Sequence, residues 1–465
     1  MTLREYNSMI SLPRRRFLQS LAAGACLPLV AQQPPERAAS ALRGNIQPWF
    51  HPAALGLFIH WSPCSVGGIE IGWGLFKDVD APNPYWPPDK YRALADHFDP
   101  QNYDPDKWLG AAAAAGFRYA VLITRHCDGY AMWPSEYGDY GTKQKMNGRD
   151  LVGPYVEACR KHGLKVGFYY CPTDWTFSPK GWPYAGFPRR DPKFLASNPL
   201  KKLGIPIYVD MPRAELQRHF EQYYAYVKGQ ITELLTRWGK IDLLWWDGYD
   251  WPVEVDIHGP EMDSYVRKLQ PTLVQNDRYV HWHGKKSQGD YNTDLEARDP
   301  SSRPPGDWEQ CEQICVGWSY RGPKAACKST EYLIDRLARD RAWGGNYLPD
   351  YGPLPDGSMP SSYYATCAEM AEWMKHSAAS IYDVEAGPYP DRCDCPVTVK
   401  GNAWFVHFLT PNQRSATLKK VGTPKSATLL RTGDAVPFNR EGDDVLLVPA
   451  QPDFTSLDDV VKVVW

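Results

Sequence analysis

The sequence predicts an α/β protein, a TIM-like (β/α) barrel followed by a small C-terminal β-sandwich. Three observations predict this fold: short apolar runs alternate with helical patterns, polar side chains follow the apolar runs, and the alternation stops near residue 388. A chain of 465 residues is long enough for one large domain and a smaller one. We therefore expect the barrel over residues 32–387 and the sandwich over residues 388–465.

The first 31 residues resemble a Tat-type export signal. Arginines 14 to 16 are followed by Phe17 and Leu18, then by a mostly apolar stretch over 20–31 and by polar glutamines. The apolar stretch is too short to anchor the chain across a bilayer. We expect a periplasmic or secreted protein with no stable membrane insertion.

The barrel region contains repeated pairs of strand and helix patterns. Helices are predicted over 106–116, 151–162 and 214–238, and the first two close on Gly116 and Gly163. The apolar runs that read as buried strands lie at 55–61, 119–124, 165–170, 241–246 and 273–276. Beyond residue 388 only short strand patterns occur, at 397–399, 403–409, 415–418, 427–431 and 445–448, which favours a β-sandwich.

Polar residues follow the predicted barrel strands at the point where each strand ends. Because the carboxyl ends of barrel strands share one face, these side chains are expected to converge. An aspartate before glycine is also a common turn residue, and a single histidine is usually structural, but five coincidences favour a site. The residues are His60, the group His126, Cys127 and Asp128, the pair Tyr169 and Tyr170, Asp247, and the group Asn276, Asp277 and Arg278.

Composition narrows the possible ligands. The formal net charge of −2 offers no basic field for nucleic acid, and the 19 Trp and 28 Tyr suit stacking on sugar rings. No Cys-x-x-Cys pair occurs, and no histidines lie near the closest cysteine spacings, 311/315 and 393/395, so no metal site is predicted. Disulfide pairing and oligomeric state are left open.

An ordered series of motifs resembles the retaining α-L-fucosidases of glycoside hydrolase family 29. The resemblance covers residues 48–385 and implies a catalytic barrel with a C-terminal β-sandwich. It also implies an exported retaining exo-α-L-fucosidase that acts on fucosylated oligosaccharides or glycoconjugates through a glycosyl-enzyme, without a cofactor. The motifs are Phe58-Ile59-His60-Trp61, Arg125-His126-Cys127-Asp128-Gly129-Tyr130, Arg149-Asp150-Leu151-Val152, Gly167-Phe168-Tyr169-Tyr170, Leu244-Trp245-Trp246-Asp247-Gly248, Asn276-Asp277-Arg278 and Gly344-Gly345-Asn346-Tyr347-Leu348.

The resemblance also implies roles for individual residues. Asp247 would be the nucleophile, and Glu296 would be the acid/base, with Asp294 and Glu309, the latter beside Glu312, as alternative acids. The sugar would be bound by His60, His126, Tyr170, Trp245 and Arg278, with Tyr169 as a competitor for Tyr170.

Three departures from the motif series leave alternatives open. Cys127 stands where the family commonly has a second histidine, and the segment from Glu70 to Trp73 replaces a Glu-Trp-Tyr motif, so Cys127, Glu70 and Trp73 are also expected around the substrate. Asp350 stands where the last motif usually carries asparagine. A glycosidase for a related sugar such as an α-galactoside, or a non-catalytic carbohydrate-binding protein on the same scaffold, is therefore an alternative function.

Overall fold

The computed structural model describes residues 45–75, 86–174, 212–247, 256, 258–279, 289–296, 300, 302–409, 413–449 and 457–465. All of them belong to one compact unit, residues 39–465. The predicted export signal at 1–31 lies outside the described residues.

Eight parallel strands form the central sheet, in the order β5-β4-β3-β2-β1-β8-β7-β6. A parallel bridge between Asn276, just after β5, and Tyr291, just before β6, joins the two ends of this order. Each strand therefore lies beside its neighbours in sequence, as in a TIM-like barrel. The strands are β1 (Gly56–Ile59), β2 (Tyr119–Arg125), β3 (Lys165–Tyr170), β4 (Leu243–Trp246), β5 (Val274–Gln275), β6 (Asn292–Glu296), β7 (Trp308–Gln313) and β8 (Asn346–Tyr351).

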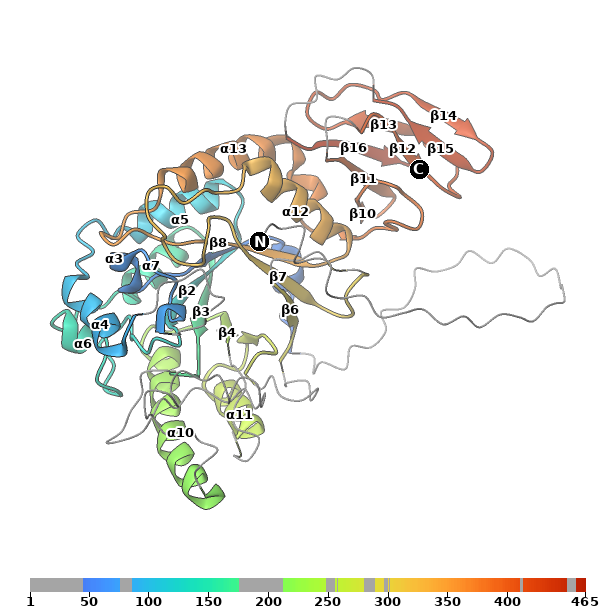
Figure 1. The fold of residues 1–465 in the computed structure, drawn as a ribbon. Helices are drawn as coiled ribbons and strands as arrows, with labels where there is room; N and C mark the ends of the chain where they lie inside the picture. The colour runs from blue at the N-terminus through green and yellow to red at the C-terminus, as the bar shows by residue number, and fades with distance from the viewer. Residues whose placement is uncertain are drawn as a thin grey trace, which may run out of the picture. The chain divides into compact units, whose positions relative to one another are not determined.

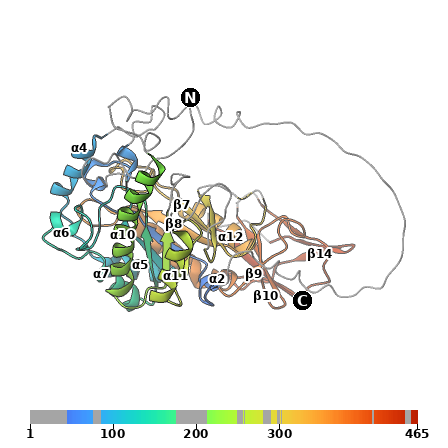
Figure 2. The same cartoon turned by 90° about the horizontal axis from the view of Figure 1, so that it is seen from below.

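Helices cover the outside of these strands. Figure 1 shows α5, α12 and α13 on one side of the strands and α10 and α11 on the other, and Figure 2 shows α10 and α11 from below. The α-helices are α2 (Phe50–Ala53), α3 (Cys64–Gly67), α4 (Pro88–Ala93), α5 (Pro105–Ala114), α6 (Thr142–Lys145), α7 (Gly153–Lys161), α10 (Arg213–Thr236), α11 (Gly259–Leu269), α12 (Thr330–Ala342) and α13 (Ser361–Ser377). The 3₁₀ turns in the described part of the chain are η1 (Trp73–Leu75), η2 (Leu94–His97) and η4 (Ala378–Ser380).

Local sequence explains where two of these helices begin. The Asp104 side chain accepts a hydrogen bond from the backbone N–H of Lys107, and Pro105 fits the first position of α5 because its missing N–H is not needed there. Ser329 caps α12 in the same way through the N–H of Tyr332. Neither cap was identified in the sequence analysis, although α5 itself was predicted to within two residues.

The barrel strands bury both faces, and the two faces belong to different apolar clusters. One cluster contains Leu57, Ile59 and Tyr170 together with side chains of the surrounding helices. The other contains Phe58 and Tyr169 and fills the barrel interior. Because successive side chains on a strand point in opposite directions, a shift of one residue moves a side chain from the barrel interior to the helix layer.

Beyond α13 the chain forms two antiparallel sheets. A five-stranded sheet has the order β13-β16-β11-β10-β9, and a three-stranded sheet has the order β12-β15-β14. One apolar cluster draws side chains from both sheets. The strands are β9 (Glu385–Ala386), β10 (Val397–Lys400), β11 (Ala403–Phe408), β12 (Ala416–Leu418), β13 (Ser426–Leu429), β14 (Phe438–Glu441), β15 (Asp444–Leu447) and β16 (Asp459–Val464). The presence of C-terminal sheets agrees with the sequence analysis, while their arrangement as a sandwich stays a prediction.

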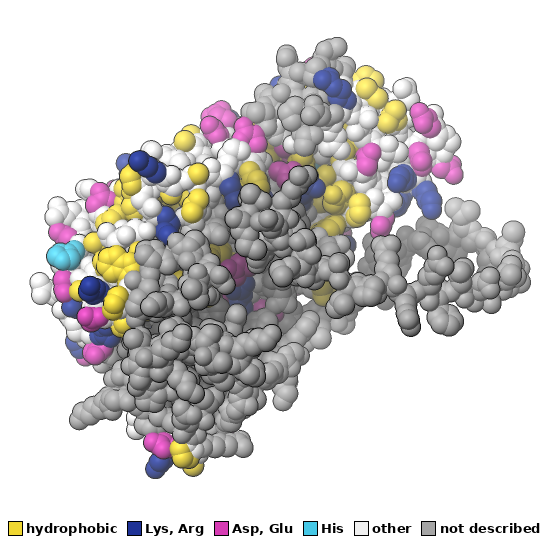
Figure 3. Space-filling model, viewed as in Figure 1, with side chains coloured by type: hydrophobic (Ala, Val, Ile, Leu, Met, Phe, Trp, Pro, Cys, Tyr) yellow, Lys and Arg dark blue, Asp and Glu magenta, His cyan; other side chains and the backbone are white. Residues whose placement is uncertain are grey.

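The surface of the described residues mixes both charge signs. On the face seen in Figure 3, basic and acidic side chains are interspersed over the described part of the chain. This distribution agrees with the small net charge of −2. Among the described helices, none combines the length and apolar character that a membrane span requires.

Candidate active site

A pocket lies at the carboxyl ends of the barrel strands and encloses about 450 Å³, including its open mouth. Aromatic rings form most of its wall, and two carboxylates and one guanidinium face into it. It is lined by Phe58, His60, Trp73, His126, Tyr169, Trp245, Asp247, Arg278, Glu296, Cys311 and Trp318.

Asp247 follows β4 directly and is the buried acid of the pocket, with 6% of its surface exposed. The Tyr169 hydroxyl donates to Asp247 Oδ2 at 2.7 Å, and Arg278 Nη1 donates to Oδ1 at 3.3 Å. Burial raises the pKa of Asp247, whereas the Arg278 charge and the Tyr169 hydrogen bond lower it. The two contacts thus favour an ionised carboxylate in a place where burial disfavours one.

Arg278 joins the two acids that the sequence predicts as catalytic. Its Nη1 lies 3.3 Å from an Asp247 oxygen and 3.1 Å from Glu296 Oε2. The arginine is itself held by Thr293, through Nε to the hydroxyl and Nη2 to the carbonyl oxygen, and by the ring of Trp245, 4.7 Å from its central carbon. The Glu296 side chain, at the end of β6, is 42% exposed, so it has access to solvent and to a departing group.

Two histidines and a tyrosine form the wall beside Asp247. The His126 ring stacks on Tyr169 with the ring centroids 5.2 Å apart and the planes 4° from parallel. His60 lies edge-on to both rings, and its Nδ1 lies 2.6 Å from Asp350 Oδ1. Burial lowers the pKa of His60 to about 4 and the pKa of His126 well below its usual value, so both rings are neutral at neutral pH.

Trp245 forms the floor and rests on a buried glutamate. Its ring stacks on Tyr169, and its Nε1 donates to Glu309 Oε1 at 2.8 Å. Glu309 also accepts a hydrogen bond of 2.5 Å from Tyr119. Burial raises the pKa of Glu309 to about 7. Glu309 lies beneath Trp245, outside the pocket lining, so it supports the floor and does not face the substrate.

A loop after β7 completes the opposite wall. The disulfide Cys315–Cys327 closes this loop, and Trp318 within it reaches His60, with the ring centroids 4.9 Å apart. Glu70 accepts from the backbone N–H groups of Trp318 and Ser319 at 2.9 and 3.3 Å. A Cβ on Gly317 would lie 2.2 Å from a Glu70 oxygen, so this close approach requires glycine there.

Several residues predicted at the substrate are placed elsewhere. Tyr170 does not line the pocket, because its side chain points outward from β3 and its hydroxyl donates to Gln230 at 2.9 Å; Tyr169 occupies the inner position instead. Glu70 and Cys127 are also outside the lining: Glu70 holds the Trp318 loop, and the Cys127 thiol lies behind His126, 2.9 Å from Nδ1.

The alternative acids also differ from the prediction. Glu309 is buried under Trp245, and Glu312 lies on the outer side of β7, where it accepts hydrogen bonds from Tyr332 at 2.7 Å and Tyr347 at 3.1 Å. Neither reaches the pocket lining. The Asp294 side chain lies outside the described residues. Of the predicted acids with a described side chain, Glu296 is the one that lines the pocket together with Asp247.

Three lining residues were not predicted from the sequence. Phe58 lies two positions before His60, and the two alternate positions share the inner face of the strand, so strand periodicity could have found it. Cys311 lies on β7, a strand that the sequence analysis did not identify. Trp318 is brought to the pocket by a disulfide-closed loop, and no sequence pattern marks it.

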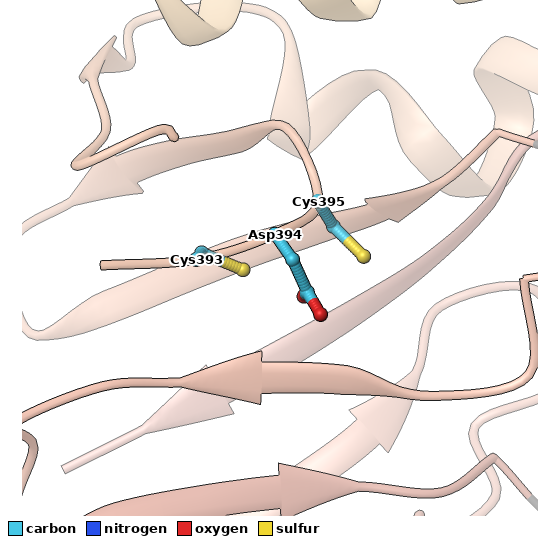
Figure 4. Close-up of side chains that lie close together, drawn as sticks. All are labelled: Cys393, Asp394 and Cys395. Atoms are coloured by element: carbon cyan, nitrogen blue, oxygen red, sulfur yellow. The ribbon is translucent and has the colours of Figure 1, made fainter. Parts of the chain in front are cut away.

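Among the described residues, one group could hold a metal ion, and it lies outside the pocket. The ligand atoms of Cys393, Asp394 and Cys395 lie within 4.8 Å of one another in the segment before β10 (Figure 4). Asp394 accepts from the backbone N–H of Thr417 at 2.9 Å, and the Gln413 amide donates to the Cys395 sulfur at 2.8 Å. These contacts join the segment to β12 and to Gln413, and the group is not part of the pocket lining.

Comparison with known proteins identifies similar sequences. A family model described as alpha-L-fucosidase matches residues 28–379. The tissue alpha-L-fucosidase of Homo sapiens is 27% identical over 352 residues, which cover 72% of this chain and 68% of that protein. The tissue enzyme of Bos taurus is 28% identical over 354 residues, with the same coverage.

Comparison with solved structures supports the fold. An alpha-L-fucosidase isoenzyme 1 from Paenibacillus thiaminolyticus is similar with a TM-score of 0.74 and 26% identity, covering 90% of this chain and 97% of that chain. A Bacteroides thetaiotaomicron alpha-L-fucosidase GH29 trapped as a covalent intermediate has a TM-score of 0.73 and 22% identity, covering 89% and 94%. At 22% identity, the second similarity supports the fold alone.

Proposed function

Because this chain belongs to the α-L-fucosidase family, glycoside hydrolase family 29, and is a glycoside hydrolase, we propose that it is an exported, retaining exo-α-L-fucosidase. It would hydrolyse terminal α-L-fucosyl linkages of oligosaccharides or glycoconjugates. The observation that carries this proposal is the pairing of Asp247 and Glu296 through Arg278 at the mouth of one ring-lined pocket.

The geometry supports a two-step mechanism. Asp247 would attack C1 of the sugar to form a glycosyl-enzyme, while Glu296 protonates the departing oxygen; Glu296 would then take a proton from the water that releases fucose. A retaining mechanism needs the two carboxyl groups roughly 5 Å apart, and contact with one arginine nitrogen keeps these two carboxylates close together.

The surrounding groups prepare Asp247 for this attack. Arg278 and Tyr169 favour its ionised form, while the buried rings of Tyr169 and Trp245 keep water away from it. The neutral rings of His60 and His126 are available for hydrogen bonds to sugar hydroxyls. A pocket that holds both acids suits one terminal sugar, which supports the exo assignment.

The direct test removes the nucleophile and replaces it chemically. Asp247→Gly is expected to lower kcat by about three orders of magnitude or more, and azide should restore turnover and yield a β-fucosyl azide. Asp242→Gly is the matched control, because Asp242 is a buried acid at the other end of the same strand, where it accepts from the N–H of Val166. This control is expected to lower stability without any azide effect. Near-normal turnover in Asp247→Gly would contradict the proposal.

The identity of the sugar is tested separately. Cys127 motivated the α-galactoside alternative, and it lies behind His126, not in the pocket lining. Fucose is therefore the proposed sugar. Nitrophenyl α-L-fucoside should be hydrolysed far faster than nitrophenyl α-galactoside, and the reverse order would favour the related sugar. Binding of fucose without hydrolysis of either would favour the non-catalytic alternative.

Export through a Tat-type pathway is proposed from the N-terminal sequence alone. The test replaces Arg14 and Arg15 together by lysine and measures activity in separated cell fractions. The wild-type chain should give activity outside the cytoplasm, and the variant should retain it inside. Equal distribution of the two chains would contradict this route.

A further inference from the structure

Asp350 contacts the pocket through one histidine. It lies on β8, whose register pairs it with Phe58 of β1, and its Oδ1 lies 2.6 Å from His60 Nδ1. Asp350 is 1% exposed, and its second oxygen, Oδ2, has no hydrogen-bond partner among the described residues. Among those residues, His60 is also the only ion-pair partner recorded for this carboxyl.

A buried carboxyl in this setting favours its neutral form. An ionised carboxylate offers four acceptor sites and is costly to bury unless cations or donors satisfy it. Among the described residues, the contacts of this carboxyl come from His60 alone, through ring Nδ1 and the backbone N–H. The charges that act on His60 are those of Glu70, Asp247 and Glu296, all of the same sign as an ionised Asp350. His126, which directly follows β2 and lies next to His60, is neutral. Burial accordingly raises the pKa of Asp350 and lowers that of His60.

The proton on this pair determines what His60 presents to the sugar. Nδ1 is engaged by Asp350, and Nε2 lies on the opposite edge of the ring that lines the pocket. If Asp350 is protonated, it donates to Nδ1, and the neutral imidazole carries its own proton on Nε2. If Asp350 is ionised, it accepts from Nδ1–H, and Nε2 is left as an acceptor.

We propose that Asp350 is a positioning residue that sets the hydrogen-bond polarity of His60, making Nε2 a donor to a sugar hydroxyl when the pair is neutral and an acceptor when it has lost a proton. The lost proton goes to solvent. The carboxylates of Asp247 and Glu296 already accept hydrogen bonds in the pocket. A donor at His60 Nε2 lets one sugar hydroxyl accept a hydrogen bond from the ring and donate its own hydrogen to another acceptor. This inference rests on the proposed function, because it assumes that fucose occupies the pocket.

The chain contains a matched pair outside the pocket. In the C-terminal sheets, His407 Nδ1 lies 2.6 Å from Asp458 Oδ2, and the pair is buried with Nε2 and Oδ1 unpartnered among the described residues. Asp458→Asn therefore removes a carboxyl from the same kind of contact without touching the pocket. This variant therefore separates a loss of fold stability from a change in sugar binding.

The test follows the inhibition constant of L-fucose from pH 4.5 to 8 in the wild type, Asp350→Asn and Asp458→Asn. Because the neutral pair is lost as pH rises through its pKa, affinity in the wild type should weaken about tenfold across that step. Asp350→Asn should lack this step, since an amide does not titrate, and Asp458→Asn should keep it. Persistence of the step in Asp350→Asn would overturn the inference.

A second measurement does not depend on the variant folding or on fucose binding. ¹⁵N-histidine NMR of the wild type, with the His60 signals assigned by comparison with His60→Gln, reports which ring nitrogen carries the proton. We expect Nε2 to be protonated at the acid end and Nδ1 at the alkaline end. One unchanged tautomer over the whole range would contradict the inference. Absence of fucose inhibition at every pH would instead contradict the proposed function, with the NMR result still deciding the role of Asp350.

Discussion

The inner and outer faces of the barrel strands are both buried and both polar, yet only the inner face forms a site. Tyr169 and Tyr170 are adjacent on β3, and each has 1% or less of its surface exposed. The Tyr169 hydroxyl donates to Asp247 in the pocket, whereas the Tyr170 hydroxyl donates to Gln230 of α10. Burial and position at a strand end therefore do not identify a functional residue; the face of the strand does.

The outer polar residues contact mainly one another. The Arg125 guanidinium lies over the Tyr170 ring, 4.4 Å from its centroid, and donates to Gln230 and to the carbonyl oxygen of Cys171. A buried cation with this many partners stabilises the packing of α10 on the barrel and leaves little capacity for a ligand. The inner residues, in contrast, keep polar atoms on the wall of the pocket.

The largest expected difference between the two faces concerns their glutamates. Glu296→Ala should slow fucosides with poor leaving groups by about 10²–10⁴-fold and affect activated aryl fucosides far less, because an activated leaving group needs no proton. Glu312→Gln, on the outer face of β7, should leave the ratio of the two rates unchanged. Steady-state kinetics on both substrate types checks this. Equal slowing of both substrates in Glu296→Ala would move the acid role elsewhere.

The next effect concerns Glu309, which lies on the inner face but beneath the pocket. Its pKa is about 7 in the folded chain against 4.5 ordinarily, so between these pH values the folded state binds more protons than the unfolded state. The free energy of unfolding should therefore fall as pH rises from about 5 to 8, by on the order of 3 kcal/mol from this group.

Glu309→Gln should flatten that dependence, because glutamine does not titrate. Urea unfolding of the wild type and the variant at pH 5, 6.5 and 8 measures the difference. If Glu309→Gln showed the same pH dependence of the free energy of unfolding as the wild type, Glu309 would not be its cause.

A smaller effect should separate the adjacent tyrosines. Tyr169→Phe removes the hydrogen bond that holds Asp247 and should lower kcat/KM about tenfold with the fold intact. Tyr170→Phe removes a bond in the outer cluster and should lower stability by about 1 kcal/mol with kcat/KM unchanged. Kinetics and thermal unfolding of both variants provide the measurement. If Tyr170→Phe lowered kcat/KM while Tyr169→Phe lowered only stability, the outer face of β3 would be the one that bears on catalysis.

The smallest expected effect is at Cys127, whose thiol contacts the back of the His126 ring. Cys127→Ala removes this contact without changing the pocket wall, so KM should rise only a few-fold, on the scale of one weak hydrogen bond. The KM for an aryl fucoside checks this. A change of a hundredfold or more would mean that Cys127 bears directly on the sugar.

Much of the barrel follows from sequence periodicity, and less of the site does. The strand at 165–170 was predicted with its observed bounds, and Asp247, His60 and Arg278 were placed at strand ends that converge on the pocket. The preference for Tyr170 is wrong, because side chains alternate along a strand and Tyr169 takes the inner position of β3. Trp318 could not be predicted, since the Glu70 contact that places it joins residues far apart in the sequence, and no pattern pairs Cys315 with Cys327.

The same limit applies to Glu309. Its residue type and its place on β7 are compatible with an acid catalyst, but three-dimensional packing puts Trp245 between it and the pocket. Strand alternation places it on the inner face, but the depth of a residue within the barrel depends on the stagger of neighbouring strands. That stagger is set by pairing across the sheet, which a single sequence does not contain.

The most direct test of Asp247 as the nucleophile is to identify the residue that becomes glycosylated. A 2-fluoro-fucosyl fluoride slows both chemical steps but keeps a good leaving group, so the covalent intermediate accumulates. After incubation, proteolysis and mass spectrometry should place one fluorofucosyl group on the peptide that contains Asp247, and Asp247→Gly should remain unlabelled. Labelling of a different carboxylate, or none while the enzyme turns over fucosides, would contradict the claim that the acid after β4 is the nucleophile.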